Sequence, residues 1–123
     1  MVASSDLVGG WRLESWALLS EDGSPPEYPL GRKATGLILY TADGFVSATL
    51  ARAGRTPLTS TADAEKARAW DDCFAYAGTY EVKGDAVFHS IEVSTNPALA
   101  GITSTRNISL EGNRLTLSGP DFS

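Results

Sequence analysis

The side chains best suited to chemistry are few, and three of them lie in segments of β-type composition. His89 is the chain's only histidine. An imidazole titrates near neutral pH and can therefore act as a general acid or base. Tyr80 can tune or relay its proton, and Arg106 offers a planar fork of donors that can hold a carboxylate, enolate or phenolate. We predict a catalytic set of His89, Tyr80 and Arg106.

Other residues with catalytic potential are sparse. One histidine and one cysteine cannot build a Cys/His zinc site, and no glycine-rich nucleotide-binding motif occurs. We therefore predict neither a metal site nor a cofactor. Asp71 and Asp72 are neighbours on a predicted helix and do not face each other, so they are not expected to form an acid pair. Cys73 is interpreted as a packing residue.

Glycine-containing turns divide the chain into short segments rich in β-branched and aromatic residues. Turn patterns occur at 22–23, 43–44, 84–85 and 112–113, and such punctuation is typical of an all-β sandwich or barrel. The predicted strands are 10–20, 36–41, 45–51, 76–83, 86–94, 103–110 and 114–118. One short helix is predicted over 62–74, where Ala67, Trp70 and Phe74 form an apolar stripe. This helix is expected to close one end of the barrel.

The turn at 84–85 predicts which side chains face the interior. With these two residues as the turn, Tyr80 opposes His89 across the hairpin, and alternation places both on the more apolar face. The same face is predicted to carry Tyr76, Gly78, Val82, Val87, Ile91 and Val93. His89 and Tyr80 are then internal neighbours, either as an acid–base pair or as a hydrogen-bonded core pair.

Two further hairpins and the first strand add to this interior. The turn at 112–113 puts Arg106 on one face with Ile108, Leu110, Leu115 and Leu117, and the turn at 43–44 groups Tyr40 with Ile38, Val46, Ala48 and Leu50. In the first strand, Trp11, Leu13, Ala17 and Leu19 share a face. A barrel of about eight strands can hold one small ligand. The predicted ligand-binding residues are Trp11, Tyr40, Tyr76, Trp70 and Ile91, although aromatic strand residues also occur in plain cores.

A family resemblance follows from motifs in sequence order. Gly9 and Trp11 resemble the G-x-W opening of calycin barrels. The segments 36–44 (GLILYTADG), 75–82 (AYAGTYEV) and 89–94 (HSIEVS) follow, with Pro97, Gly101 and Arg106 behind them. Together they resemble the bacterial and fungal lipocalin-like domain family over nearly the whole chain. The resemblance implies an all-β fold: a single antiparallel barrel of about seven to eight strands with an apolar cavity.

The resemblance also bears on residue roles and on assembly. In lipocalins an arginine stacks on the barrel-end tryptophan, so Arg106 is either such a cap on Trp11, with Arg114 as its rival, or a ligand anchor. Members of the family often accompany genes for secondary metabolism, and related small barrels include cofactor-free cyclases and isomerases. Such domains usually carry one more strand at the end. We therefore expect an open barrel, closure through the long first strand, or a homodimer that pairs sheet edges.

Composition limits the partners. A length of 123 residues fits one domain, 1–123. A net charge of −5 argues against nucleic acid, and the sequence contains neither a membrane-length apolar run nor a basic amphipathic helix. The first six residues lack the basic and apolar regions of a secretory signal, and Cys73 is a single cysteine, so we expect a cytoplasmic protein.

Two functions from different classes remain open. The first is a cofactor-free cyclase, isomerase or dehydratase that orients an apolar, oxygenated molecule while His89 and Tyr80 move a proton. In that case Arg106 or Tyr40 would stabilise oxyanion charge. The second is a carrier or sequestering protein that uses the same pocket without chemistry. A third possibility is a purely structural barrel whose interior is filled by side chains and which binds no ligand.

Overall fold

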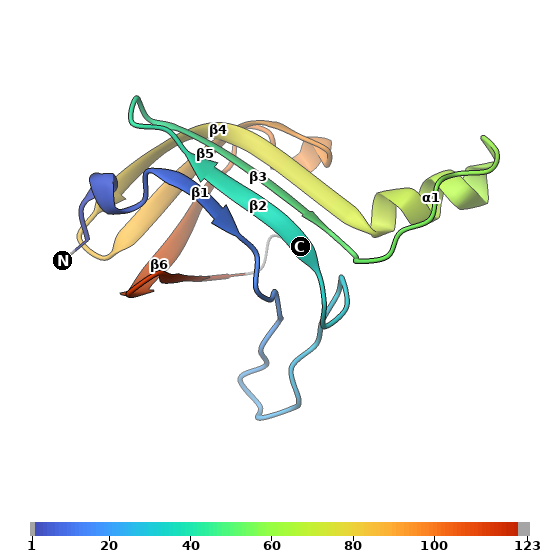
Figure 1. Ribbon diagram of the computed structural model, residues 1–123, viewed down its shortest axis with the longest axis horizontal. Coiled ribbons are helices and arrows are strands. Elements are labelled where there is room, and N and C mark those ends of the chain that lie inside the picture. Colours follow the sequence, from blue (N-terminus) through green and yellow to red (C-terminus); the bar gives the residue numbers. More distant parts are fainter. Residues whose placement is uncertain (1, 121–123) are drawn as a thin grey trace.

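The computed structural model describes residues 2–120, which form one antiparallel sheet of seven strands in chain order. The sheet curls into a nearly closed barrel (Figure 1). Its strands are β1 (Gly9–Arg12), β2 (Thr35–Tyr40), β3 (Phe45–Ala51), β4 (Cys73–Lys83), β5 (Ala86–Ser94), β6 (Thr103–Glu111) and β7 (Arg114–Ser118). The helical elements are η1 (Ser4–Asp6), α1 (Asp63–Asp71) and η2 (Pro97–Leu99). This confirms the all-β barrel with one short helix.

Tight turns set the registers, and the predicted pairings around them are confirmed. Gly84 and Gly112 both have a φ of +61°, the left-handed region that glycine enters at little cost. Tyr80 pairs with His89 beyond the first of these turns, and Ile108 pairs with Leu117 beyond the second. Alternation from these fixed points places one side chain in two inside the barrel.

A β-bulge interrupts the pairing of β4 with β5. Gly78 pairs with Ile91 while the preceding Ala77 pairs with Val93, so Glu92 is an extra residue on β5. The extra residue reverses the alternation, which leaves Val93 63% exposed. The prediction that Val93 faces inward is therefore wrong. A Cβ at Gly78 would lie 1.9 Å from the Ser90 carbonyl oxygen, so only glycine allows this close approach.

The first strand is shorter than predicted. β1 ends at Arg12 rather than near residue 20, and the following segment leaves the sheet to pack Trp16 edge-on against Phe74, with ring centroids 5.2 Å apart. Further along, Leu18 and Glu27 pair with each other in an isolated bridge, within the long connection from β1 to β2 that hangs below the barrel in Figure 1. Leu19, which was predicted to face inward, is 79% exposed. Local contacts of this loop replace the predicted pairing in the sheet.

The helix projects away from the barrel instead of closing it (Figure 1). α1 ends at Asp71, Phe74 already belongs to β4, and no residue of the helix is buried. The Arg52 amide donates to the Asp72 carbonyl at 2.8 Å, and the two side chains form an ion pair at 3.0 Å. These contacts extend the β3–β4 pairing outward and hold the helix at its far end. None of the helices within residues 2–120 is long and apolar enough to cross a membrane.

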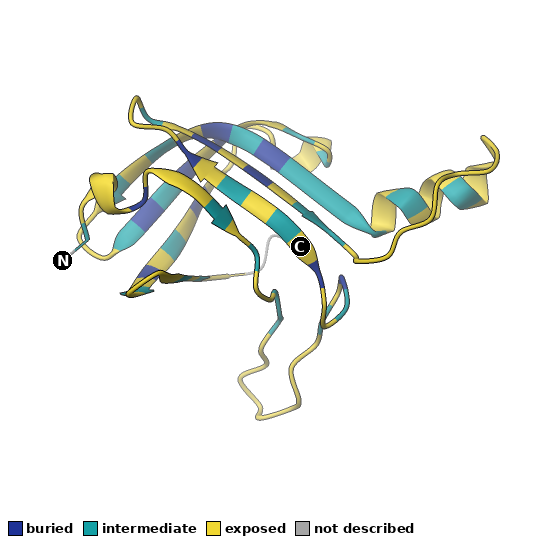
Figure 2. Ribbon diagram, viewed as in Figure 1, coloured by how far each residue is buried: buried dark blue, intermediate teal, exposed yellow. Residues whose placement is uncertain are grey.

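Buried side chains alternate with exposed ones along the strands (Figure 2). One core cluster contains Leu7, Tyr40, Val46, Val87 and Ile108, and a second contains Ala48, Tyr76, Ile91 and Leu99. Ile38 packs against both clusters. His89 is buried among these apolar residues with an exposed fraction of 0%.

Candidate functional site

The barrel interior is built around the imidazole of His89 on β5. The hydroxyl oxygen of Tyr40, from β2, lies 2.6 Å from Nε2, and that of Tyr76, from β4, lies 2.9 Å from Nδ1. Tyr40 and Tyr76 are themselves buried, at 2% and 7% exposed. Both ring nitrogens therefore have a tyrosine partner, and we call this set the Tyr40–His89–Tyr76 triad.

Tyr80 is the backbone neighbour of His89, but its hydroxyl points elsewhere. It donates to the Thr41 carbonyl at 2.8 Å, and its ring stands edge-on to Tyr40 at 4.8 Å. The predicted hydrogen bond between Tyr80 and His89 is therefore wrong. Side chains paired directly across strands stand side by side, so the long phenol reaches past the imidazole. The ring nitrogens contact Tyr40 from β2 and Tyr76, which comes before Tyr80 on β4.

The triad is uncharged at neutral pH. Burial, with a smaller contribution from the charge of Arg106, lowers the pKa of His89 to about 4. Burial raises the pKa of Tyr76 to about 12, and burial together with the neighbouring Tyr76 and Tyr80 raises the pKa of Tyr40 still further. Neutral imidazole has one donor and one acceptor nitrogen. One tyrosine therefore donates to the ring and the other accepts from it, and the tautomer of His89 decides which tyrosine plays which role.

Ser104 on β6 is a buried polar residue that sequence reasoning missed. It pairs with His89 across β5 and β6 and is 6% exposed. Its hydroxyl oxygen has no hydrogen-bond partner within the part of the chain that the structure describes. Alternation back from Arg106 could have placed Ser104 on the inner face, since the two are separated by one residue.

Arg106 lies half-buried on the same strand. Its guanidinium donates to the Pro120 carbonyl at 2.7 Å and to the Thr105 carbonyl at 3.3 Å. Two cation–π contacts are described within residues 2–120, Arg32 on Tyr28 and Lys83 on Phe88, and the cap of Arg106 on Trp11 stays a prediction. Arg114, the rival for that contact, forms an ion pair with Glu14 at 2.9 Å. The indole nitrogen of Trp11 donates to the Leu7 carbonyl at 2.8 Å.

The interior is only partly covered near the two ends of the sheet. Trp11 on β1, Ile38 on β2, and Leu115 and Leu117 on β7 pack on the core cluster that contains Tyr40 and are only partly buried. They lie on the outermost strands of the sheet order, β1 and β7, or on β2 beside β1, and we call these four side chains the apolar rim.

A family comparison gives this arrangement a context. The model of the lipocalin-like domain matches residues 8–121. The chain belongs to this family. Comparison with curated proteins and with solved structures gave no match. The lipocalin-like barrel fold suggests small-molecule binding.

The lipocalin-like barrel brings together most of the predicted ligand-binding residues, but not all. Tyr40, Tyr76 and Ile91 are buried inside, and Trp11 lies at the rim. Trp70 is 52% exposed on the projecting helix and lies apart from them, so it does not pack the helix onto the barrel as predicted. Within residues 2–120, no group of three or more His, Cys, Asp or Glu side chains is placed to hold a metal ion.

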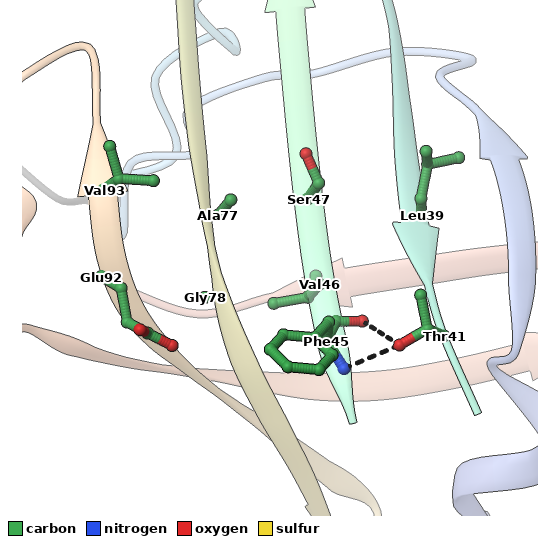
Figure 3. A pocket seen from close by; sticks show the side chains of 9 residues that line it. All are labelled: Leu39, Thr41, Phe45, Val46, Ser47, Ala77, Gly78, Glu92 and Val93. Atoms are coloured by element: carbon green, nitrogen blue, oxygen red, sulfur yellow. Dashed lines mark hydrogen bonds between the residues drawn. The ribbon is translucent and has the colours of Figure 1, made fainter. Parts of the chain in front are cut away.

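A hollow lies on the outer face of the lipocalin-like barrel. It is a groove of about 340 Å³ across β2 to β5, and Figure 3 shows Leu39, Phe45 and Val93 among its walls. These three side chains are 46%, 52% and 63% exposed. The sequence signal for this groove is a set of apolar residues at outward-facing strand positions, and these residues were not predicted to form a groove. The groove is a competing place for an apolar ligand, so binding experiments must separate it from the interior.

Proposed function

We propose that this chain binds an apolar, oxygenated small molecule inside its lipocalin-like barrel, against the Tyr40–His89–Tyr76 triad. The observation that carries the proposal is the fully buried imidazole with both nitrogens bonded to buried phenols. Burial of polar groups costs free energy that aliphatic side chains would avoid. Aliphatic side chains could fill the same space without this cost, and we therefore take the three polar groups as a sign of ligand recognition.

The apolar rim supports the same proposal. Trp11, Ile38, Leu115 and Leu117 pack on the inner core cluster but are only partly buried. Burial of apolar area stabilises a complex by roughly 25 cal/mol per Å², so a ligand that covers these residues gains affinity. Its polar atoms would meet hydroxyl groups deeper in the barrel, as is usual in pockets with apolar walls and a few polar contacts.

Neighbouring residues on opposite faces of β2 provide a matched test. Ile38 faces the interior, whereas Leu39 is 46% exposed and lines the outer groove. Titration calorimetry with 2-acetonaphthone, an apolar ketone, should show weaker binding in Ile38→Trp and unchanged binding in Leu39→Trp. Leu117→Trp, also on the inner face, guards against misfolding of the first variant. Weakening by Leu39→Trp alone would place the ligand in the outer groove and end the proposal.

A second candidate function is a cofactor-free isomerase, cyclase or dehydratase. It is favoured by the chemistry of the triad, because imidazole and phenol are groups that can take up and release protons. Orientation of a bound substrate can contribute up to about 7 to 11 kcal/mol to catalysis, and proton transfer by a positioned group adds to this. The low pKa of His89 keeps the imidazole neutral at pH 7 but makes it a weak base, so the larger part of any rate gain is expected from orientation of the substrate.

Proton transfer can be assayed without the natural substrate. 2-Tetralone exchanges its acidic C1 protons for deuterium in D₂O, and NMR follows the loss of that signal. The wild type should accelerate the exchange, and Tyr76→Phe should slow it while 2-tetralone affinity stays within about threefold. Exchange at the buffer rate in the wild type would remove the catalytic candidate and leave the binding proposal intact.

A further inference from the structure

We infer that Ser104 and Arg106 form a subsite for a weakly acidic or carboxylate oxygen of the ligand. The inference rests on the proposed binding function and narrows its ligand class. In this inference, residues of β6, the strand that pairs with the strand of His89, bind a ligand oxygen that carries a full or partial negative charge. The ligand class is therefore carboxylic acids, enols and phenols with an apolar body, rather than hydrocarbons or amines.

The unpartnered hydroxyl of Ser104 is the first reason. Ser104 is 6% exposed, and its Oγ makes no hydrogen bond within residues 2–120. Its cross-strand partner, His89, cannot satisfy it, because both imidazole nitrogens are bonded to Tyr40 and Tyr76. Buried hydroxyl groups in folded proteins nearly always have a partner. A ligand oxygen beside Ser104 would supply one.

Position on the strand is the second reason. Ser104 and Arg106 are separated by one residue on β6, so both side chains lie on the inner face. Their partners on β5 are His89 and Val87, both with 0% exposure. An oxygen held by Ser104 would therefore have the triad on one side and apolar surface on the other. The ligand atoms bonded to that oxygen would then lie near the hydroxyl groups of the triad's tyrosines.

Charge is the third reason. The charged residues of the other strands, Arg12, Glu81, Lys83, Glu92 and Arg114, are exposed, as is Glu111 at the end of β6. Arg106 is half-buried, and its positive charge lowers the pKa of both His89 and Tyr76, so its field reaches the interior. The bonds to the Pro120 and Thr105 carbonyls hold its guanidinium at the edge of that space. A positive field in a low-dielectric interior favours negative oxygen and disfavours ammonium groups.

Three probes with one ring system test the inference. 2-Naphthoate carries a carboxylate, 2-acetonaphthone a neutral carbonyl, and 2-isopropenylnaphthalene has the ketone's shape without oxygen. Dissociation constants are measured by fluorescence titration for the wild type, Ser104→Ala, Arg106→Gln and the control Ser109→Ala. Ser109 lies exposed on the outer face of the same strand.

The expected pattern separates the two residues. Wild-type protein should bind naphthoate most tightly and the hydrocarbon least. Ser104→Ala should weaken both oxygenated probes about tenfold, the effect of one lost hydrogen bond, and leave the hydrocarbon unchanged. Arg106→Gln should weaken naphthoate alone, and Ser109→Ala should change nothing. Thermal unfolding of Ser104→Ala should show no loss of stability, since an unpartnered hydroxyl is removed.

The failures are distinguishable. If Ser104→Ala affects all three probes equally or none of them, the subsite does not exist, while binding of the probes still supports the proposed function. A lower unfolding temperature in Ser104→Ala would show that its hydroxyl is already satisfied, by a trapped water for example, and would overturn the inference. If none of the probes binds the wild type, the proposed function falls and the inference falls with it.

Discussion

Acidification should destabilise the fold through His89. Its pKa falls from the usual 6.5 to about 4 on burial, so the unfolded chain takes up a proton in a pH range where the folded chain does not. Each pKa unit corresponds to 1.36 kcal/mol. The difference of about 2.5 units therefore corresponds to about 3 kcal/mol of unfolding free energy.

The sign follows from proton linkage. The stability contributed by neutral His89 is fully present above about pH 6.5 and is lost as the pH falls toward 4. Below pH 4 both states carry the proton and the slope from this residue vanishes. Carboxylates also titrate near the lower end of this range, so the measurement needs a reference protein without the imidazole.

Urea unfolding at pH 7, 6, 5 and 4 provides the assay, with tryptophan fluorescence as the probe of folding. The variant His89→Gln keeps a polar side chain but does not titrate, and it shares all the carboxylates of the wild type. The wild type should lose about 3 kcal/mol more than the variant between pH 7 and pH 4. Parallel pH profiles would refute the account, as would an NMR titration midpoint near 6.5 for the single histidine.

Four further predictions concern stability and assembly. Tyr40→Phe and Tyr76→Phe each leave a nitrogen of His89 unpaired and should cost about 1 to 3 kcal/mol in urea unfolding; a cost equal to that of Tyr80→Phe, whose hydroxyl bonds Thr41, would argue against a special role for the triad. Gly78→Ala should cost at least about 2 kcal/mol, because its Cβ meets the Ser90 carbonyl at 1.9 Å; a neutral result would show that the bulge relaxes freely. Trp70→Phe should change the unfolding free energy by less than about 0.5 kcal/mol, since Trp70 is half-exposed; a larger loss would mean that α1 packs on the barrel. Because the sheet ends at β1 and β7, we expect a homodimer in sedimentation at high concentration, and a single 13.0 kDa species would contradict it.

The hairpin registers could be predicted from the sequence because local chemistry sets them. Gly84 and Gly112 mark turns that glycine adopts readily, and strict alternation then places His89 and Ile108 inside. Val93 was assigned to the wrong face because the bulge at Glu92 adds one residue. Its sequence signal is the glycine inside the paired strand, Gly78, which was not used as evidence of a bulge. Alternation along a strand predicts the inward-facing residues only up to the next β-bulge.

Long-range features were harder to predict. The end of β1 is set by the contact of Trp16 with Phe74, and the position of α1 is set by the ion pair of Arg52 with Asp72. Both contacts join segments far apart in the sequence, which periodicity does not reveal. The same reason explains the site. Alternation correctly placed Tyr40, Tyr76 and His89 on inner faces, but which tyrosines reach the imidazole depends on the curvature of the sheet.

The central claim, that the ligand lies inside the barrel against the triad, is tested most directly by intermolecular NMR contacts. Nuclear Overhauser effects between bound 2-naphthoate and ¹³C-labelled protein report side chains close to the probe. The account predicts contacts to the rings of Tyr40, Tyr76 and Trp11 in the interior. Contacts confined to Leu39, Phe45 and Val93 would place the ligand in the outer groove and contradict the account.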